Sequence, residues 1–327
     1  MGGPAPPAGP GTAGLRAVRG KSIAVLGGGS LGLYLAGRLA LAGHRVTVAL
    51  RPGTPAPSGI VAEGDEQWSA AVEYADIGRL RGPYAQVIVA VKSHDLPPLL
   101  PALAALGDGA TEYVFLQNGI PWWWRGIAGD GLPRARQVVG VVVQHSAERT
   151  APGRIRVRRT AGDRYLCGRP DGSVDAALES LAADWRHAGI PAETTPALRR
   201  QVWTKLMGNA TLNPLSAITG ATVGELATEP ATRAVLLAGM AEIARLAERD
   251  GAGVDNTPEQ RVARSAEVGG VRTSMLQDRL AGRPLETEAL LAAPIAIAEE
   301  YGEAVPVLRT LYGCLAFSST SPERNPT

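Results

Sequence analysis

The sequence predicts an α/β domain with a parallel, doubly wound sheet, followed by an all-helical domain. Three observations predict this arrangement. Short buried apolar runs alternate with helical segments through the first half of the chain. From Pro196 onward, apolar residues recur at helical spacing instead. The length of 327 residues is also sufficient for two domains that each bury a core of their own.

The boundary between the two domains is placed near Pro196, so that residues 21–196 form the α/β domain and residues 197–317 the helical domain. Residues 1–20 are rich in Gly, Ala and Pro, and we expect them and residues 318–327 to be disordered. The first of these segments has no apolar core like that of a signal peptide, so we expect a cytoplasmic protein.

The elements of the α/β domain follow from short apolar runs separated by turn residues. A strand at 23–26 leads into a glycine-rich turn at 27–32 and then a helix at 33–42. Later strands are expected at 46–50, 87–91, 114–117 and 138–143. A helix at 96–106 has early prolines, which suit the first turn of a helix.

Charged and apolar residues alternate over Arg154–Arg158, as expected of a strand with one solvated face. The four arginines within 154–159 could instead bind phosphate, but a solvated sheet face is the commoner arrangement. In the second domain, apolar residues at helical spacing predict helices at 231–249, 285–300 and 307–315.

Composition excludes several classes of protein. The net charge of +2 gives no electrostatic reason to expect a nucleic acid or an anionic membrane as partner. No apolar run approaches the roughly 18 residues of a membrane span. Cys167 and Cys314 lie far apart, and neither they nor the four histidines show metal-binding spacing. We therefore expect reduced thiols and no metal.

The turn at 27–32 has the sequence Gly-Gly-Gly-Ser-Leu-Gly and stands between a predicted strand and a predicted helix. Gly27 allows the tight turn, Gly29 lets the backbone approach a pyrophosphate, and Gly32 lets the helix pack close to the strand. The helix N-terminus offers free amides and a positive dipole to phosphates. A plain glycine-rich turn is the alternative, but the context favours a Rossmann-type dinucleotide site formed by Gly27, Gly28, Gly29, Ser30, Leu31 and Gly32.

The residue at the end of the second strand distinguishes the two nicotinamide dinucleotides. NAD-binding proteins place Asp or Glu there to bind the ribose hydroxyls, whereas Arg51 would suit the 2′-phosphate of NADP. We therefore expect NADP(H), with a plain surface arginine as the alternative. Lys92 follows the strand at 87–91, at the edge where such sheets bind ligands, and is either a cofactor contact or a solvated lysine.

Only three of the 33 basic residues are lysine, and asparagine occurs only five times. A guanidinium cannot replace an ammonium that must donate a proton, so the positions of the lysines are informative. Lys205, Asn209 and Asn213 are spaced i, i+4 and i+8, which places them along one face of a helix. Apolar side chains flank this stripe, and a ligand could supply the partners that its polar groups need. A solvent-facing polar stripe is the plainer alternative.

Five motifs, in this order along the chain, resemble those of the ketopantoate reductases: GGGSLG at 27–32, VAVK at 89–92, QNG at 117–119, WTKLMGNATLNPL at 203–215, and TSMLQD at 273–278 with GRPLE at 282–286. The resemblance covers residues 22–315, nearly all of the chain between its tails. It implies an N-terminal Rossmann domain, a C-terminal helical domain, and reduction of a small 2-oxo acid, 2-dehydropantoate, to pantoate with NADPH. It also implies a cytoplasmic enzyme on the route to coenzyme A, and it leaves a homodimer open.

The resemblance also implies roles for single residues. Lys205 is similar to the general acid of the family, and Glu286 to an essential carboxylate that interacts with this lysine and with the bound ligands. Asn118 resembles an asparagine that contacts both cofactor and substrate. Substrate contacts are implied for Asn118, Asn209, Asn213 and Ser274, and cofactor contacts for Arg51, Lys92, Asn118 and Glu286. Ser146 aligns loosely with a backbone contact to the cofactor.

The implied mechanism takes hydride from NADPH to the ketone carbon, while Lys205 protonates the developing alkoxide. We expect Pro284 to begin a helix with Glu286 in its first turn, where the helix dipole favours an ionised carboxylate. That charge would keep the Lys205 ammonium protonated. A capping glutamate without a catalytic role is the alternative. Pro214 is expected to end or bend the preceding helix at Asn213.

Several departures from the family pattern bear on the ligands. Three tryptophans at 122–124 replace a small-residue loop, and they could line a larger binding site or pack the domain junction. Val223 and Val271 stand where the family often has substrate-binding asparagines, and Asp95 departs on the cofactor side. The alternatives are therefore a family member that reduces a larger or more apolar ketone or imine and, in another class, a non-catalytic NADP(H)-binding regulator.

Overall fold

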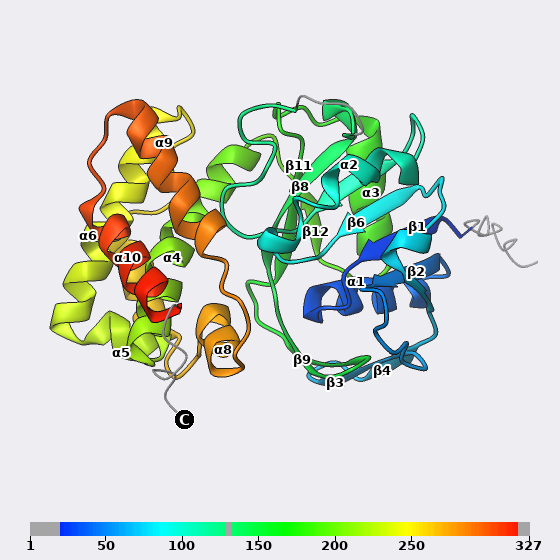
Figure 1. Ribbon diagram of the computed structural model, residues 1–327, viewed down its shortest axis with the longest axis horizontal. Helices are drawn as coiled ribbons and strands as arrows, with labels where there is room; N and C mark the ends of the chain where they lie inside the picture. Colours follow the sequence, from blue (N-terminus) through cyan, green and yellow to red (C-terminus); the bar gives the residue numbers. More distant parts are fainter. Residues whose placement is uncertain (1–19, 128–131, 320–327) are drawn as a thin grey trace, which may run out of the picture.

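The computed structural model describes residues 20–127 and 132–319, which form two lobes lying side by side along the long axis of the molecule (Figure 1). The predicted fold class is confirmed, because an α/β lobe is followed by an all-helical lobe. Most of the two tails, 1–20 and 318–327, lies outside the described residues, and the first two residues of the C-terminal tail belong to the last helix.

A sheet of eight strands forms the centre of the α/β lobe. Its order is β12 (Ala192–Thr194), β11 (Arg164–Gly168), β8 (Val138–Gln144), β7 (Glu112–Phe115), β6 (Gln86–Val89), β1 (Ser22–Leu26), β2 (Arg45–Leu50) and β5 (Glu73–Asp76). β8 and β11 pair antiparallel, and the other neighbours in this order pair in parallel. The chain leaves β1 for β2 on one side and reaches β6 on the other, and ligands bind at the carboxyl ends of strands at such a switch point.

A second sheet lies beside the first and holds one helix against it (Figure 1). Its strands are β4 (Trp68–Ala70), β3 (Ile60–Gly64), β10 (Arg154–Arg158) and β9 (Ser146–Ala151). α1 (Ser30–Leu41) packs between the two sheets, and α3 (Ala176–His187) buries its Trp185 in the same core. In β10 the apolar residues face inward and the arginines outward, where Arg156 pairs with Glu63 at 3.0 Å. This is the solvated sheet face that the alternating pattern favours.

Successive residues of β8 face two different hydrophobic cores. Val139, Val141 and Val143 pack with α1, α3 and the second sheet. Val138 and Val142 pack on the opposite face, in a core that continues into the helical lobe. The large sheet therefore separates a core under α1 from a core that joins the two lobes.

The helical lobe is built around one long helix. Its elements are α4 (Leu198–Thr219), α5 (Val223–Thr228), α6 (Pro230–Arg249), α7 (Pro258–Glu267), α8 (Ser274–Leu280), a π-helical turn (Glu288–Ala292), α9 (Ala293–Tyr301) and α10 (Pro306–Ser319). α4 packs against α6, α8 and α10, and also against β8 and β11 of the other lobe. The helices predicted at 231–249 and 307–315 are confirmed as α6 and α10. The domain boundary near Pro196 stays a prediction.

The helix predicted at 96–106 is wrong for most of its length. The structure has only α2 (Leu100–Leu103), with 3₁₀ turns at Ser93–Asp95 and Ala104–Leu106. Prolines at 97, 98 and 101 remove three backbone donors, so a continuous helical ladder cannot form. Two other 3₁₀ turns lie at Ile77–Arg79 and Ala135–Gln137.

Of the two effects expected of Pro214, an end of the helix at Asn213 is wrong, whereas a bend there stays a prediction. α4 continues through Pro214 to Thr219 and stops at Gly220, whose φ of +77° is the left-handed C-cap conformation. Asn213, Pro214 and Leu215 are all buried, so tertiary packing compensates for the backbone bond that proline removes.

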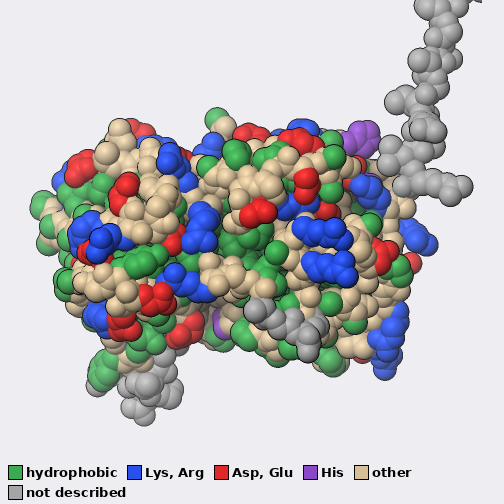
Figure 2. Space-filling view, turned by 90° about the horizontal axis from the view of Figure 1, so that it is seen from above, with side chains coloured by type: hydrophobic (Ala, Val, Ile, Leu, Met, Phe, Trp, Pro, Cys, Tyr) green, Lys and Arg blue, Asp and Glu red, His purple; other side chains and the backbone are tan. Residues whose placement is uncertain are grey.

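One face of the molecule carries charges of both signs. Basic and acidic side chains are interspersed over the face in Figure 2, and hydrophobic side chains gather where the lobes meet. Within residues 20–127 and 132–319, no helix has the length and apolarity needed to span a membrane.

Candidate active site

The glycine-rich turn between β1 and α1 has the form that a bound phosphate requires. Gly27 has φ of +113°, and a Cβ on Gly32 would lie 2.1 Å from the Gly27 carbonyl oxygen. A Cβ on Gly29, by contrast, would meet nothing within 4 Å, so the space in front of this residue is open. Gly29 occupies the N-cap position without a side-chain cap, which leaves amides of the first helical turn available. The turn therefore fits a pyrophosphate.

Arg149 lies next to the same turn, although it comes from β9 in the second sheet. One guanidinium nitrogen, Nη1, donates to the carbonyl oxygen of Gly28 at 3.3 Å. This contact places a positive charge beside the open face of the turn, where a phosphate would need one.

Arg51, at the end of β2, is exposed and paired with an unexpected partner. Its Nη2 lies 2.6 Å from Oδ2 of Asp95, in the 3₁₀ turn that follows β6. The residue that was expected to bind a 2′-phosphate therefore already contacts a carboxylate.

Lys92 crosses from the α/β lobe to the helical lobe. Its Nζ lies 2.8 Å from Oδ2 of Asp278 and 3.1 Å from Oε2 of Glu286. The Ser93 amide donates to Oε1 of Glu286 at 3.2 Å, and Arg283 Nε donates to Oδ1 of Asp278 at 2.7 Å. Burial lowers the pKa of Lys92, but the two carboxylates outweigh this effect, and the net direction is upward.

The expected place of Glu286 in a helix is therefore wrong. The helical residues begin at Thr287, so Glu286 directly precedes the helix, and its backbone carbonyl oxygen accepts a bond from the Leu290 amide at 3.3 Å. Its carboxylate is held by Lys92 and by the Ser93 amide of the other lobe. Within the described residues, no ion pair joins Glu286 to Lys205, and the partner of this glutamate is Lys92.

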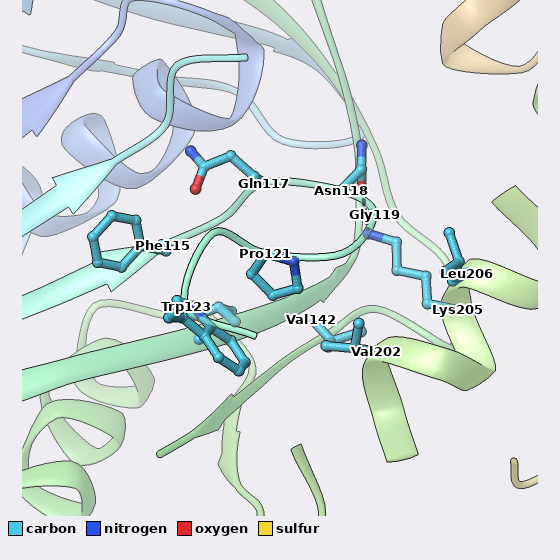
Figure 3. Close-up of a pocket in the computed structure, with 12 residues that line it drawn as sticks. Phe115, Gln117, Asn118, Gly119, Pro121, Trp123, Val142, Val202, Lys205 and Leu206 are labelled. Carbon is cyan, nitrogen blue, oxygen red and sulfur yellow. Dashed lines mark hydrogen bonds between the residues drawn. The ribbon is translucent and has the colours of Figure 1, made fainter. Parts of the chain in front are cut away.

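Lys205, on α4, points toward the loop that follows β7 (Figure 3). Its Nζ donates to Oδ1 of Asn118 at 2.8 Å across the junction between the lobes. The two residues line a small cavity with Trp123, Val142 and other side chains. Its volume of about 20 Å³ has room for roughly one water molecule.

Burial lowers the pKa of Lys205 to about 8, and the negative charge of Glu286 opposes this effect only in part. The expected effect of Glu286 has the right direction, because its charge favours the protonated amine, but burial outweighs it and the net shift of the Lys205 pKa is downward. The amine loses hydration on leaving water, whereas the carboxylate acts from a distance and is itself neutralised by Lys92. The result is an ammonium that can give up its proton near neutral pH.

The position of Asn118 depends on a close backbone approach between the lobes. Gly119 has φ of +85°, and a Cβ there would lie 2.3 Å from the carbonyl oxygen of Ala289 in the π-helical turn. The next amide, that of Ile120, donates to the same carbonyl oxygen at 3.0 Å. Gln117 ties the loop to the neighbouring strand through bonds to the carbonyls of Val89 and Val91, both at 2.9 Å.

Comparison with known proteins finds one family across both lobes. The family model "Ketopantoate reductase PanE/ApbA" matches residues 23–170, and "Ketopantoate reductase PanE/ApbA C terminal" matches residues 197–318. The curated 2-dehydropantoate 2-reductase of Mesorhizobium japonicum is 32% identical over 294 residues, which cover 83% of this chain and 89% of the relative. The chain belongs to the ketopantoate reductase family. Its members are oxidoreductases that act on CH–OH groups, and they use NADPH.

Solved structures of the ketopantoate reductase family share the fold. The 2-dehydropantoate 2-reductase of Geobacter metallireducens has a TM-score of 0.81 at 26% identity, covering 91% of this chain and 99% of that one. D-mandelate dehydrogenase, solved with NADH and anilino(oxo)acetate, has a TM-score of 0.79 at 18% identity, covering 90% and 97%. The second likeness shows the fold alone.

The substrate-side residues of the ketopantoate reductase pattern lie on the helical lobe. Asn209 and Asn213 follow Lys205 along α4, and no hydrogen bond to either side chain occurs within the described parts of the chain. Ser274 is exposed in the first turn of α8, whose N-cap is Thr273. Free amide groups beside a buried amine are available to a ligand.

The two valines that replace asparagines lie together. The amide of Val223 donates to the carbonyl oxygen of Val271 at 2.9 Å, so these positions form one backbone bridge. Their side chains offer a ligand no hydrogen bonds.

The tryptophans mainly pack the junction of the lobes. Trp123 and Trp124 are buried, and Trp124 meets Trp203 of α4 edge to face, with ring centroids 5.7 Å apart. The Arg199 guanidinium covers Trp124 at 3.9 Å from the ring centroid. Trp123 also lines the cavity beside Lys205, whereas a role of the tryptophans in a larger binding site stays a prediction.

Sequence reasoning missed Ser93, Arg149 and Asp278 as parts of the site. Asp278 stands inside one of the family motifs, but 186 residues separate it from Lys92 in the sequence. Arg149 lies on β9, the strand that begins at Ser146, but the loose alignment of Ser146 with a cofactor contact did not point to Arg149 itself. Only the folded chain brings these groups to the cleft.

Proposed function

We propose that this protein reduces a 2-oxo acid to a 2-hydroxy acid with NADPH, and that the substrate is 2-dehydropantoate and the product (R)-pantoate. The observation that carries the proposal is the amine of Lys205, which is held by Asn118 between the lobes and has its pKa lowered to about 8. The relatives named 2-dehydropantoate 2-reductase support the choice of substrate.

Lys205 is proposed as the general acid. NADPH, when bound, supplies the hydride for this kind of reduction. The ammonium of Lys205 donates a hydrogen bond to the carbonyl oxygen of the substrate, stabilises the negative charge that develops there, and then transfers its proton. Asn118 aims the amine, since its Oδ1 accepts the bond from Nζ before a substrate takes that place.

Other residues are proposed to hold the two ligands. The turn of Gly27, Gly28, Gly29, Ser30, Leu31 and Gly32 fits the pyrophosphate, and Arg51, Lys92, Asn118 and Glu286 complete the cofactor side. Asn118, Asn209, Asn213 and Ser274 bind the substrate through their amide and hydroxyl groups. Glu286 acts through its charge and through Lys92, which it contacts at 3.1 Å.

The test is NADPH oxidation by the purified protein with 2-dehydropantoate and a graded panel of other 2-oxo acids. Lys205→Ala should lower kcat by at least about a hundredfold while NADPH still binds. Lys21→Ala is the matched control. Lys21 forms an ion pair with Asp184 at a distance of 2.5 Å, and neither residue belongs to the proposed site, so this variant should leave turnover unchanged. Normal turnover by Lys205→Ala would remove Lys205 as the acid.

A second candidate is a larger or more apolar ketone. Val223 and Val271 favour it, because two asparagine amides suited to a small hydroxylated acid are replaced by apolar side chains. The same panel separates the candidates: a higher kcat/KM for a bulky apolar 2-oxo acid than for 2-dehydropantoate would select the second.

A cytoplasmic homodimer is also proposed, from the family resemblance. One ketopantoate reductase with this fold, from Staphylococcus aureus, is described as dimeric at 20% identity. Light scattering on the full-length protein would measure the oligomeric state, and fractionation of the source cells would test the location.

A further inference from the structure

Two opposite charges meet over the carboxyl end of β1. Arg51 ends β2 and Asp95 lies in the turn after β6, and β1 is the strand between these two. The pair therefore bridges the crevice at the switch point of the sheet. Its Nη2–Oδ2 distance is 2.6 Å, with the side chains 76% and 31% exposed.

The turn that carries Asp95 is fixed in place. The Asp95 amide donates to the carbonyl oxygen of Lys92 at 3.0 Å, and the amide of Ser93 donates to Glu286. Asp95 is thus anchored by Lys92 and Ser93, the two residues that also contact Glu286 of the helical lobe. His94 lies nearby, with its Nε2 3.8 Å from Oδ2 of Asp95.

Arginine and a carboxylate at this place favour different cofactors. A guanidinium binds the 2′-phosphate of NADPH, whereas a carboxylate accepts hydrogen bonds from the ribose hydroxyls of NADH. A phosphate that reaches Arg51 must displace Asp95 or remain beside it, and two negative groups so close repel each other. A ribose hydroxyl meets no such repulsion.

We propose that Asp95 is a specificity residue that competes with the 2′-phosphate for Arg51 and keeps the preference for NADPH over NADH small. This inference rests on the proposed function, since it requires that the turn at 27–32 binds the nicotinamide dinucleotide. It adds to that function a second usable cofactor, NADH, and names the carboxylate responsible.

The test measures dissociation constants of NADPH and NADH on the full-length protein, by nicotinamide fluorescence at low ionic strength. Asp95→Asn keeps the shape of the side chain and removes its charge. We expect NADPH to bind about tenfold tighter, while NADH binding is unchanged or weaker, so that the ratio of the two constants rises. Arg51→Ala should act in the opposite direction and abolish the preference.

Glu63→Gln is the matched control, because Glu63 pairs with Arg156 at 3.0 Å on the second sheet, with a similar exposed fraction of 40%. It should leave the ratio unchanged. An Asp95→Asn ratio within twofold of the wild type, with both dinucleotides bound, overturns the role of Asp95 alone. Binding of neither dinucleotide by the wild type overturns the proposed function as well.

Discussion

Lys205 shows how a single side chain is tuned by its surroundings. The amine leaves water and keeps one acceptor, Oδ1 of Asn118, while the nearest opposing charge is already neutralised by Lys92. Burial therefore dominates and lowers the pKa to about 8. A general acid is most effective when its pKa lies near the working pH, and Lys205 meets that condition.

The pH dependence follows from this direction. With Lys205 as the proposed general acid, reduction requires the protonated amine, so kcat/KM should be constant at neutral pH and fall as the pH rises through about 8. Oxidation of the hydroxy acid requires the neutral amine and should rise over the same range. Steady-state rates in both directions, measured across this range, check the sign.

Asn118→Ala supplies the control for this profile. The bond from Nζ to Asn118 favours the charged amine, so its loss should move the alkaline break to lower pH. A break that stays in place, or moves upward, would contradict the role of Asn118 in holding the ammonium.

At the residue scale, the sequence was sufficient for Lys205 and Asn118 but not for the partner of Glu286. The rarity of lysine drew attention to Lys205, whereas Asn118 came from the QNG motif of the family resemblance. The ion pair of Glu286 with Lys92 could not be predicted, because 194 residues separate them and either of two lysines in the motifs could fill that place. Only the way the two lobes pack together shows that Lys92, and not Lys205, pairs with Glu286.

Alanine substitutions at two glycines of the β1–α1 turn should affect different properties, cofactor binding at Gly29 and folding stability at Gly32. Gly29 has φ of −78°, and its Cβ position is open, so Gly29→Ala should fold normally but obstruct the phosphate. We expect NADPH affinity to fall by about tenfold or more, with an unchanged Tm. Gly32→Ala should instead lower Tm, because its Cβ would meet the Gly27 carbonyl oxygen at 2.1 Å. Titration and thermal melts distinguish the two, and a Tm loss in Gly29→Ala would refute the assignment.

The loop after β7 offers a similar comparison. Gly119 and Gly126 both have positive φ, +85° and +103°, so alanine strains either one. Only at Gly119 would the new Cβ also meet a backbone oxygen, that of Ala289 at 2.3 Å, whereas the space around Gly126 is open. Gly119→Ala should therefore lose both stability and kcat/KM by a larger factor than Gly126→Ala. Equal losses in melts and assays would show that the contact between the lobes is unimportant.

At the element scale, periodicity located α1, α4, α6, α9 and α10 but misplaced some of their ends, and it gave no indication of α3, α5, α7 and α8. Pro214 is compatible with a continuous α4 because its neighbours are buried, and no local rule includes that packing. The helix predicted at 96–106 does not form because the segment has more prolines than the first turn of one helix can accommodate. The local sequence sets a preference for helix or for a helix end, and tertiary packing can override that preference.

At the scale of the whole molecule, Lys92 joins the lobes through Asp278 and Glu286. Lys92→Met would leave two buried carboxylates with fewer partners, and we expect a loss of roughly 1–2 kcal/mol, reduced because Lys92 is partly exposed. Arg283→Met is the control, since Arg283 contacts the same Asp278 at 2.7 Å from within the helical lobe. Thermal melts and small-angle scattering should show a looser pair of lobes for Lys92→Met only. Equal behaviour of both variants would argue against the bridging role.

The order of the two lobes was predictable from the pattern of apolar residues. Short apolar runs alternate with helical segments in the first half of the chain, whereas apolar residues recur at helical spacing in the second half. The second sheet was not, since β3 pairs in parallel with β10 across a long stretch of sequence. Short strands such as β4 carry too few residues to show a period.

The two-faced strand β8 limits how this chain can change in length. Its odd-numbered valines belong to one core and its even-numbered valines to the other. Deletion of a single residue inside the strand would exchange the two sets and turn the wall of the Lys205 cavity toward α1. Insertions and deletions are therefore tolerable only in the connections around β8, and new substrate preferences in such a chain must arise by exchange of side chains or by remodelling of loops.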